Sequence, residues 1–507
     1  MKKAKRIFFF MLTMLILFCV LTACGETAEE KNRDKGTQST NAQNPDGTGE
    51  TNDGAAQPDF ADITFDGYEF TFLAPFYDSS GWLSPSPLEI VAEIEDTDTP
   101  VGDAVYKRNM TIEKKYDVKI KMVSKQGMDE TDTLIKAVAA GETTYDAVLI
   151  FGNNVPRAVT SDLLINVANL PFIDLNNPWW DPAVTAMSVA NKQFLMAGDL
   201  LILDNEATNA MIFNKKLMTD WGMELPYNMA KQGKWTMDTM NSMIKNVAKD
   251  LNGDGKMTAF EDQWGLAVYN DTLHALLVGG GGTLALKDDN DIPYIDLASH
   301  RNLAVMDKAM DLMYNPDYVV NCQSAPYSAK RHKSSVSEIY RSGFEEDRML
   351  FVWIRMRVVE QFRGMESEFG ILPMPKYDEL QENYYSVVNP FATVMLGMPK
   401  SADDLNRVSI ILEALSAESS HTLQSAYYDV VLQRKYVRDA ESSEMLDIIF
   451  NSRVYDIGGV YNFGNVFYGM IALSSSYDRN IVSFVDSGSG AMKQAIEQLV
   501  KTYQNMD

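Results

Sequence analysis

The chain has 507 residues, 46% of them hydrophobic and 10% aromatic, and its formal net charge is −25 at pH 7. So acidic a surface argues against nucleic-acid binding, because the phosphate backbone is bound by clustered Lys and Arg. The length predicts two or more domains with substantial hydrophobic cores, and cores of this size need no disulfide.

Residues 1–23 have the pattern of a secretory signal peptide. Basic residues come first, an apolar run follows from Ile7 to Val20, and small residues precede Cys24. The alternative is a transmembrane anchor, but the run is short for a span of about 20 residues. Leu-Thr-Ala-Cys at 21–24 resembles the lipobox of bacterial lipoproteins. This resemblance implies a diacylglyceryl group on Cys24 and a location at the extracellular face of the cell membrane.

Residues 24–59 form the next distinct segment. After Cys24 they are rich in Glu, Asn, Gly, Thr, Gln and Asp and contain no aromatic residue. Such a composition cannot bury enough apolar surface to fold. We therefore expect a disordered tether between the lipidated cysteine and a folded body.

The folded body begins with alternating strand and helix signals. Strand patterns occupy 63–74, 116–123 and 145–151, and helix patterns occupy 102–115 and 132–140. Strands that alternate with helices predict an α/β fold with a parallel sheet and covering helices.

Further along, the predicted elements are less regular. A pair of strands is predicted between Phe194 and Phe213, and apolar residues at helical spacing follow Trp235. A short strand is predicted at 369–373, and Ser401 with Asp404 predicts the start of a helix. More helices are predicted around 447–450 and at 490–503.

Residues 250–261, DLNGDGKMTAFE, have the spacing of a calcium loop, with Gly255 at the sixth position where a sharp turn is needed. The residues after the loop resemble a strand, so we expect a structural Ca²⁺ site and no helix-opening switch. The alternative is an acidic turn without metal, because Asn-Gly and Asp-Gly are common turn formers. The predicted ligands are Asp250, Asn252, Asp254, the backbone carbonyl of Lys256, Thr258 and Glu261.

The sequence lacks three catalytic signatures. It has no nucleophile elbow, no zinc-protease motif and no dinucleotide glycine fingerprint. Cys322 is the only cysteine left once signal cleavage and lipidation are taken into account. A lone cysteine is more often a small core residue than a nucleophile. The sequence therefore predicts a protein that is not an enzyme.

Several segments, taken in order and spacing, carry a family resemblance that covers nearly all of the folded body from about Ile63. They resemble the family 1 extracellular solute-binding lipoproteins of ABC importers, which include maltose- and oligosaccharide-binding proteins. Residues 349–357, MLFVWIRMR, depart from the small-residue pattern common in that family. The matching segments are YDAVLIF (145–151), LINVANLPFIDLNNPWWDP (164–182), NAMIFNKKLMTDWGMELPYN (209–228) with GKWTMD (233–238), FGILPMPKYDE (369–379) with GMPKSADD (397–404), and 426–450.

The resemblance implies two α/β lobes of the class II periplasmic-binding-protein-like fold, joined by a hinge of crossing strands. Lobe one would contain 60–206 and 365–415, and lobe two 209–355 and 418–507. The ligand would lie in the cleft, closure would be hinge bending, and the closed monomer would dock on the membrane subunits of an ABC permease. The expected crossings are near 204–209, 353–369 and 416–420.

Sugars present apolar ring faces and rims of hydroxyls, so a sugar site needs flat aromatic side chains with polar partners. Trp353 and Glu206 are the leading candidates for ligand contact. The alternative for each candidate is a structural role, and only one of Tyr427 and Tyr428 can face a cleft. The other candidates are Trp179, Trp180, Asp204, Asn205, Arg355, Tyr384, Tyr385, Asn389, Tyr427 and Tyr428.

These features predict a lipid-anchored receptor that delivers a small solute to an ABC permease. The leading candidate for the solute is an oligosaccharide. A surface-anchored carbohydrate-active enzyme is an alternative, because 70 acidic residues easily supply a carboxylate pair. A peptide, amino acid, phosphate-bearing compound or metal chelate could replace the sugar. A sensory receptor would use the same fold.

Overall fold

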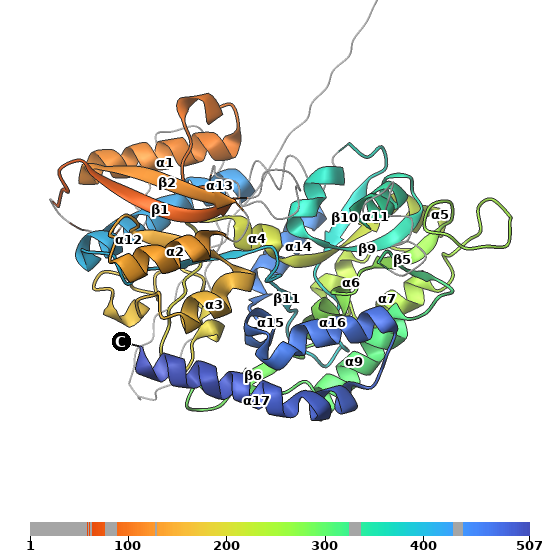
Figure 1. Ribbon diagram of the computed structural model, residues 1–507. Coiled ribbons are helices and arrows are strands. Elements are labelled where there is room, and N and C mark those ends of the chain that lie inside the picture. Colours follow the sequence, from red (N-terminus) through yellow and green to blue (C-terminus); the bar gives the residue numbers. More distant parts are fainter. Residues whose placement is uncertain are drawn as a thin grey trace, which may run out of the picture. The chain divides into compact units, whose positions relative to one another are not determined.

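The computed structural model contains two main β-sheets surrounded by helices (Figure 1). All described residues belong to one compact unit, Ala56–Asp507. Among them, no helix combines the length and the hydrophobicity that a membrane span requires. The signal peptide, Cys24 and residues 25–57 lie outside the described residues. These are 58, 60, 63–76, 89–126, 129–323, 336–362, 364–428 and 440–506.

The first sheet has the strand order β12-β3-β1-β2. β1 (Tyr68–Phe76) pairs in parallel with β2 (Val118–Gln126) and β3 (Ala147–Phe151), as the alternating signals predicted. β12 (Val394–Gly397) is antiparallel to β3 and returns from far along the chain. Strand side chains alternate between the faces. One face packs under α1 (Pro100–Tyr116) and α12 (Leu405–His421), and the other packs against α2 (Asp129–Ala140).

Local sequence determines where α1 begins and ends. The Thr99 hydroxyl accepts a hydrogen bond from the Gly102 amide at 3.0 Å, and Pro100 occupies the first turn, where its missing N–H has no cost. Asp117 ends the helix with φ of 49°, and its backbone amide donates to the Glu113 carbonyl. The chain then enters β2 directly.

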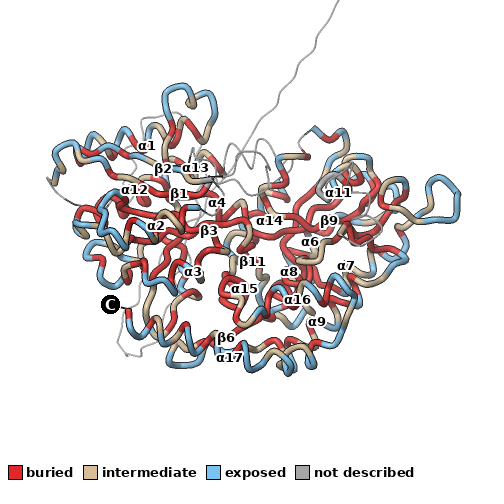
Figure 2. Tube along the Cα trace, viewed as in Figure 1, coloured by how far each residue is buried: buried red, intermediate tan, exposed pale blue. Residues whose placement is uncertain are grey.

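The second sheet has the order β10-β4-β9-β5-β8. β5 is parallel to β8 and β9, and β4 is antiparallel to β9 and β10. The interior of both sheets is buried, whereas many outer helical faces are exposed (Figure 2). The strands are β4 (Asn209–Asn214), β5 (Trp264–Val268), β8 (Val319–Asn321), β9 (Met349–Arg355) and β10 (Phe369–Leu372).

Helices on the second sheet follow the predicted pattern of apolar faces. α7 carries the predicted apolar residues Met240 and Ile244 into the core, and Thr236 caps it by accepting the Thr239 amide. The helices of this region are α5 (Lys215–Asp220), α6 (Tyr227–Lys231), α7 (Met237–Ile244), α8 (Thr272–Gly279), α9 (His300–Met313), α11 (Val336–Glu345) and α14 (Ala440–Asn451).

Three short segments lie side by side where the chain passes between the sheets. Thr208 forms an antiparallel bridge with Val388, and β11 (Ser386–Val387) pairs in parallel with β13 (Arg453–Val454). A helix of one turn, α4 (Leu203–Ala207), comes immediately before Thr208. We call residues 203–208, 386–389 and 453–454 the crossing ladder.

The crossing ladder corrects part of the predicted hinge. Residues 203–208 lead directly into β4 of the second sheet, and the crossing expected near 204–209 stays a prediction. The return expected at 353–369 is wrong, because Trp353 lies inside β9 and β10 pairs with β4 of the second sheet. The chain re-enters the first sheet only at β12. The second segment of lobe one was predicted to start at residue 365, and this is wrong for β10, which pairs with the second sheet. Residues 416–420 lie within α12 and are no crossing.

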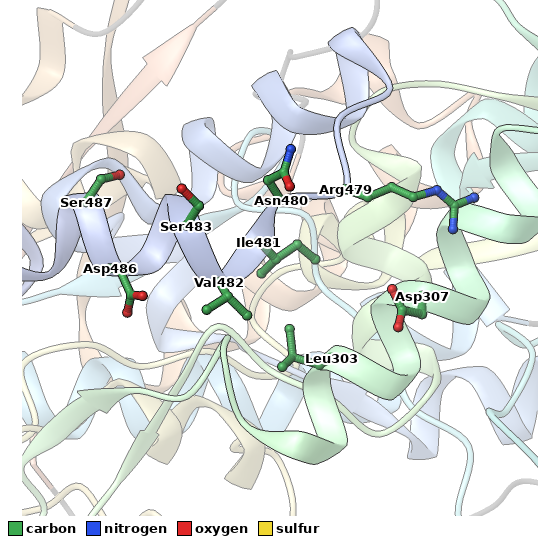
Figure 3. A pocket seen from close by; sticks show the side chains of 9 residues that line it. All are labelled: Leu303, Asp307, Arg479, Asn480, Ile481, Val482, Ser483, Asp486 and Ser487. Carbon is green, nitrogen blue, oxygen red and sulfur yellow. The ribbon is translucent and has the colours of Figure 1, made fainter.

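Residues near the C-terminus contact both parts of the fold. α17 (Ile481–Asn505) begins beside α9, where Leu303 faces Val482 across a groove of about 830 Å³ (Figure 3). Near its end, the Tyr503 ring packs on Phe194 with centroids 4.9 Å apart, and Lys192 donates to the Met506 carbonyl. The end of α17, which the prediction assigns to lobe two, therefore contacts residues that the prediction assigns to lobe one.

A hairpin makes a second connection between the same parts. β6 (Ala285–Lys287) and β7 (Pro293–Ile295) are antiparallel, and their turn contains Asp291. The Asp291 carboxylate accepts the Ser188 hydroxyl and the Asn191 amide, each at 2.9 Å. The Ala190 amide donates to the Asp291 carbonyl, also at 2.9 Å. These hydrogen bonds therefore hold residues 188–191, which the prediction placed in lobe one, against the hairpin.

Candidate functional site

Polar and aromatic residues gather where the strands of the second sheet end. Ligands of α/β sheets bind beyond the carboxyl ends of the strands. Asn270 follows β5, and its backbone amide donates to the Gln323 side chain at 2.8 Å. The Asn321 amide donates to the Asn270 side-chain oxygen at 2.9 Å. We call this group the carboxyl-end cluster: Tyr269, Asn270, Asp271, Asn321, Gln323, Trp353 and Arg355.

Trp353 is the aromatic centre of the cluster. It is 4% exposed, and its ring meets Tyr269 edge-on with centroids 5.5 Å apart. Its indole N–H has no hydrogen-bond partner among the described residues. Buried polar groups are rarely left unpaired, so a ligand oxygen is a suitable acceptor for this donor.

Asp271 and Arg355 provide opposite charges within the cluster. Burial raises the pKa of Asp271, while Arg355, a hydrogen bond with Asn389 and His274 oppose the rise. Burial lowers the pKa of Arg355, and Asp271 opposes this fall. The Asn389 backbone amide also donates to the Ala207 carbonyl at 3.0 Å. Asn389 thus connects the cluster to the crossing ladder.

Arg453 holds the ladder together by ion pairs. Its guanidinium lies 3.1 Å from the Asp181 carboxylate and 3.3 Å from the Asp204 carboxylate, and it donates to the Asn205 side chain. Burial raises the pKa of Asp204 to about 6 against the opposing effect of Arg453. The ion pairs join β13 to α4 and to the loop before residue 182.

A second charged group lies at the first crossing. The Glu206 carboxylate is 3.9 Å from the Arg357 guanidinium, and burial raises the pKa of Glu206. Glu89 is 2% exposed, and its carboxylate accepts the Ile202 amide at 3.0 Å. Burial, reinforced by nearby Glu206, raises the pKa of Glu89 to about 8. The first crossing therefore brings buried carboxylates together with the guanidinium groups of Arg357 and Arg453.

Comparison with known proteins gives a clear result for the fold. No family model and no curated protein matches the chain. An ABC substrate-binding protein from Listeria monocytogenes, in complex with cycloalternan, is similar at 13% identity and a TM-score of 0.51, over 87% of this chain and 100% of that one. The fold is that of the ABC substrate-binding proteins.

Two other solved structures agree. A cyclo/maltodextrin-binding protein complexed with maltotetraose has 14% identity and a TM-score of 0.52, over 86% of this chain and 97% of that one. A sugar transporter from Rhizobium etli in an open conformation has 11% identity and a TM-score of 0.53, over 87% and 100%. The predicted α/β, two-lobed substrate-binding-protein fold is confirmed.

Two predicted ligand residues lie inside the core of this substrate-binding-protein fold. Trp179 and Trp180 are 4% and 3% exposed. Their indole N–H groups donate to the two carboxylate oxygens of Glu413 at 3.0 and 2.8 Å, and Asn177 donates to the same side chain. Their polar groups are paired and their rings pack in the first sheet's core, so the structure does not support a role in ligand contact.

The predicted tyrosines lie on other segments of the chain than Trp353. Tyr427 is buried in a core with α14 residues, and the Tyr428 hydroxyl donates to Asp447 of α14. Tyr384 and Tyr385 line a separate pocket beside β13. The structure brings together Trp353, Arg355 and Asn389, and it places Asp204, Asn205 and Glu206 at the adjoining crossing.

Sequence reasoning missed other polar residues of the site. Asn270 and Asp271 directly follow the strand-like stretch DQWGLAVY, so the rule about carboxyl ends could have found them. Arg453 and Arg357 gave no signal, because only folding brings them to their carboxylates. Glu89 lies 113 residues before its backbone partner Ile202.

The predicted calcium loop is folded by its own side chains. Asp250 accepts the amides of Gly253 at 2.7 Å and Gly255 at 2.8 Å, and Asn252 accepts the Asp254 amide at 2.9 Å. A strand, β5, follows the loop as predicted, but α7 ends at Ile244, six residues before Asp250.

One observation on this loop supports a bound metal, and two others argue against it. The buried hydroxyl oxygen of Thr258, at the ninth position, has no hydrogen-bond partner among the described residues. Within the same residues, however, no three His, Cys, Asp or Glu side chains are grouped as metal ligands. Asp262, which the motif does not include, accepts the amides of Leu251 and Thr258 at 3.0 and 2.6 Å. The calcium site stays a prediction.

Cys322 is fully buried, and burial raises the pKa of its thiol to about 12. A thiol that stays protonated at neutral pH is a poor nucleophile. The residue is thus placed as a core side chain, in agreement with the structural interpretation of the sequence.

Proposed function

We propose that the protein is a receptor that binds an oligosaccharide and delivers it to the membrane subunits of an ABC permease. The carboxyl-end cluster beside the crossing ladder carries this proposal. A buried tryptophan with an unpaired N–H, a second aromatic ring and an Asp–Arg pair match the needs of a sugar. The fold is shared with proteins whose structures contain cycloalternan and maltotetraose.

Each group would have a separate task. Trp353 and Tyr269 would contact apolar sugar faces, and the Trp353 N–H would donate to a hydroxyl or ring oxygen. Asp271 would accept hydroxyl hydrogens, and Arg355 and Asn389 would donate to hydroxyl oxygens. No bond of the ligand is broken in this scheme, and the sugar leaves unchanged.

Closure would take place at the crossing ladder. Short segments at the ends of elements absorb hinge rotations in proteins of two lobes. Asn389 belongs to the ladder and also reaches Asp271, so a ligand bound at the cluster would favour one arrangement of the ladder. The closed monomer would then dock on the permease.

Two further proposals concern the membrane anchor and the calcium loop. Diacylglyceryl-modified Cys24 would hold the protein at the extracellular face of the membrane, with residues 25–59 as its tether. Ca²⁺ at 250–261 would stabilise the connection into β5, with ligands from Asp250, Asn252, Asp254, Lys256, Thr258 and Glu261. The unpaired Thr258 oxygen supports the second proposal.

Titration calorimetry with maltotetraose and raffinose tests the binding proposal on the protein and on two matched variants. Trp353→Phe removes the unpaired N–H and should weaken binding about fivefold, since such a hydrogen bond contributes about 1 kcal/mol. Trp221→Phe, at a 39% exposed tryptophan, should change nothing. Chromatography of the sugar after incubation separates a receptor from an enzyme. Shorter sugars in the product, or no binding of either glycan, would contradict the proposal.

A further inference from the structure

A pocket of about 520 Å³ lies beside β13, and no residue of the carboxyl-end cluster lines it. Residues 382–385 form one side, and the last turn of α14 with β13 forms the other. Its volume falls within the range of about 300–1,000 Å³ that small-molecule sites occupy. The pocket is therefore large enough for a ligand of its own.

Neighbouring contacts hold one aromatic wall in place. The Tyr384 hydroxyl donates to the Ala230 carbonyl at 2.9 Å, and the Lys376 ammonium lies 5.5 Å from the centre of the Tyr384 ring. The next residue, Tyr385, lies immediately before β11, and the pairing of β11 with β13 fixes the backbone there. Within the described part of the chain, no hydrogen bond occupies the Tyr385 hydroxyl. A half-buried tyrosine ring on a fixed backbone offers a flat face and a free polar tip.

The opposite wall supplies hydrogen-bonding groups of both kinds. Asn451 ends α14 with an exposed amide, and Asp447 one turn earlier presents a carboxylate that already accepts the Tyr428 hydroxyl. The Ser452 hydroxyl donates to Ser386 at 3.3 Å, so the two walls are tied together at their base.

The charge balance of the pocket selects against anions. Among the described residues that line the pocket, Arg453 is the one cation, and the ion pairs with Asp181 and Asp204 already compensate that charge. Glu382 and Asp447 are both exposed and add negative charge. A neutral ligand rich in hydroxyls can use the carboxylates, the amides and the tyrosine face together, and an anion cannot.

We infer that this pocket is a second binding site, for a neutral polyhydroxylated ligand the size of one or two sugar units. Tyr385 provides the ring face, and Asn451 and Asp447 provide the hydroxyl partners. The inference does not depend on the proposed transport function, because none of these residues belongs to the carboxyl-end cluster. Since Arg453 lines the pocket and pairs with α4, an occupant lies against the crossing ladder.

Saturation-transfer NMR with D-glucose and with maltose tests this site. The Trp353→Phe/Asp271→Asn double variant disables the carboxyl-end cluster, and transfer to the sugars should persist in it. Adding Tyr385→Ala to that double variant should reduce the transfer at least fivefold. Asn451→Ala, at an exposed position with little risk to folding, should reduce it in the same background. Tyr294→Ala, at a 44% exposed tyrosine on β7, is the matched control and should leave it unchanged.

The outcomes separate the two sites. Transfer that disappears in the double variant alone, or that survives both Tyr385→Ala and Asn451→Ala, would overturn the second site. Absence of transfer to either sugar in every protein would overturn it as well. Transfer that persists in the double variant and depends on Tyr385 and Asn451 would support the second site, even if calorimetry finds no oligosaccharide at the first.

Discussion

Glu413 shows how one side chain fixes the core of the first sheet. It is 1% exposed, and it accepts hydrogen bonds from Trp179, Trp180 and Asn177. Glu413→Ala would leave the two buried indole donors and the half-buried Asn177 amide unpaired, so the free energy of unfolding should fall by about 3–5 kcal/mol. Glu413→Gln keeps one acceptor and should cost less. Urea unfolding measures both; equal losses for the two variants would show that the hydrogen bonds contribute little.

Glu89 gives the molecule a measurable pH dependence. Its pKa is raised from the ordinary 4.5 to about 8. Between these values the folded state keeps a proton that the unfolded chain has released. The contribution of Glu89 to stability is therefore complete below pH 4.5 and is lost as the pH rises to about 8.

Glu89→Gln should flatten this part of the stability curve, measured by urea unfolding between pH 4.5 and 8. Glu95→Gln, at an exposed glutamate of the same segment, is the control and should leave the slope as it is. A slope that is the same in the protein and in Glu89→Gln would mean that Glu89 ionises normally when folded.

At the scale of single residues, the sequence identifies side chains that suit a ligand site, but it does not reveal what surrounds each of them in the fold. Trp353 was expected at the ligand and lies in the carboxyl-end cluster. Trp179 and Trp180 carry the same chemical signal, but they face Glu413, which lies more than 230 residues later. Nothing in a local window reveals such a partner. The same holds for Arg453 and its two carboxylates.

Among the elements, those with strong local periodicity are predicted well. β1, β2 and β3 and the helices between them occupy nearly the expected ranges, because alternation and helical spacing are local properties. β10 has only four residues, and its partner β4 lies over 150 residues earlier. Its assignment to a sheet depends on that pairing, which composition does not encode. The pairing of the other two ladder segments, 386–389 and 453–454, was missed for the same reason.

The loop at 250–261 makes an element-scale prediction. If Ca²⁺ binds it, 1 mM CaCl₂ should raise the melting temperature over EDTA, since a ligand at 100 times its Kd contributes about 2.7 kcal/mol. Glu261→Gln should abolish the shift by removing the last ligand. Asp289→Asn, in an acidic turn without this spacing, is the control. Identical melting temperatures in CaCl₂ and EDTA would leave the loop as an ordinary turn.

At the scale of the whole molecule, the β6–β7 hairpin is a connection that can be weakened at one residue. Asp291→Ala removes the acceptors of the Ser188 hydroxyl and the Asn191 amide. Hydrogen exchange at residues 188–191 should become at least tenfold faster, because local opening loses these bonds. Asp289→Asn lies in the same turn and should not alter the exchange. Unchanged exchange in Asp291→Ala would show that other contacts hold the loop.

α17 limits how the protein can open. Its 25 residues extend about 37 Å at 1.5 Å per residue, with one end beside α9 and the other against Phe194. A straight helix attached at both ends cannot lengthen. Any rotation of one sheet away from the other must either have its axis close to this rod or bend it. Dyes placed on either side of α17 would therefore report small distance changes, whereas pairs on the far rim would report large ones.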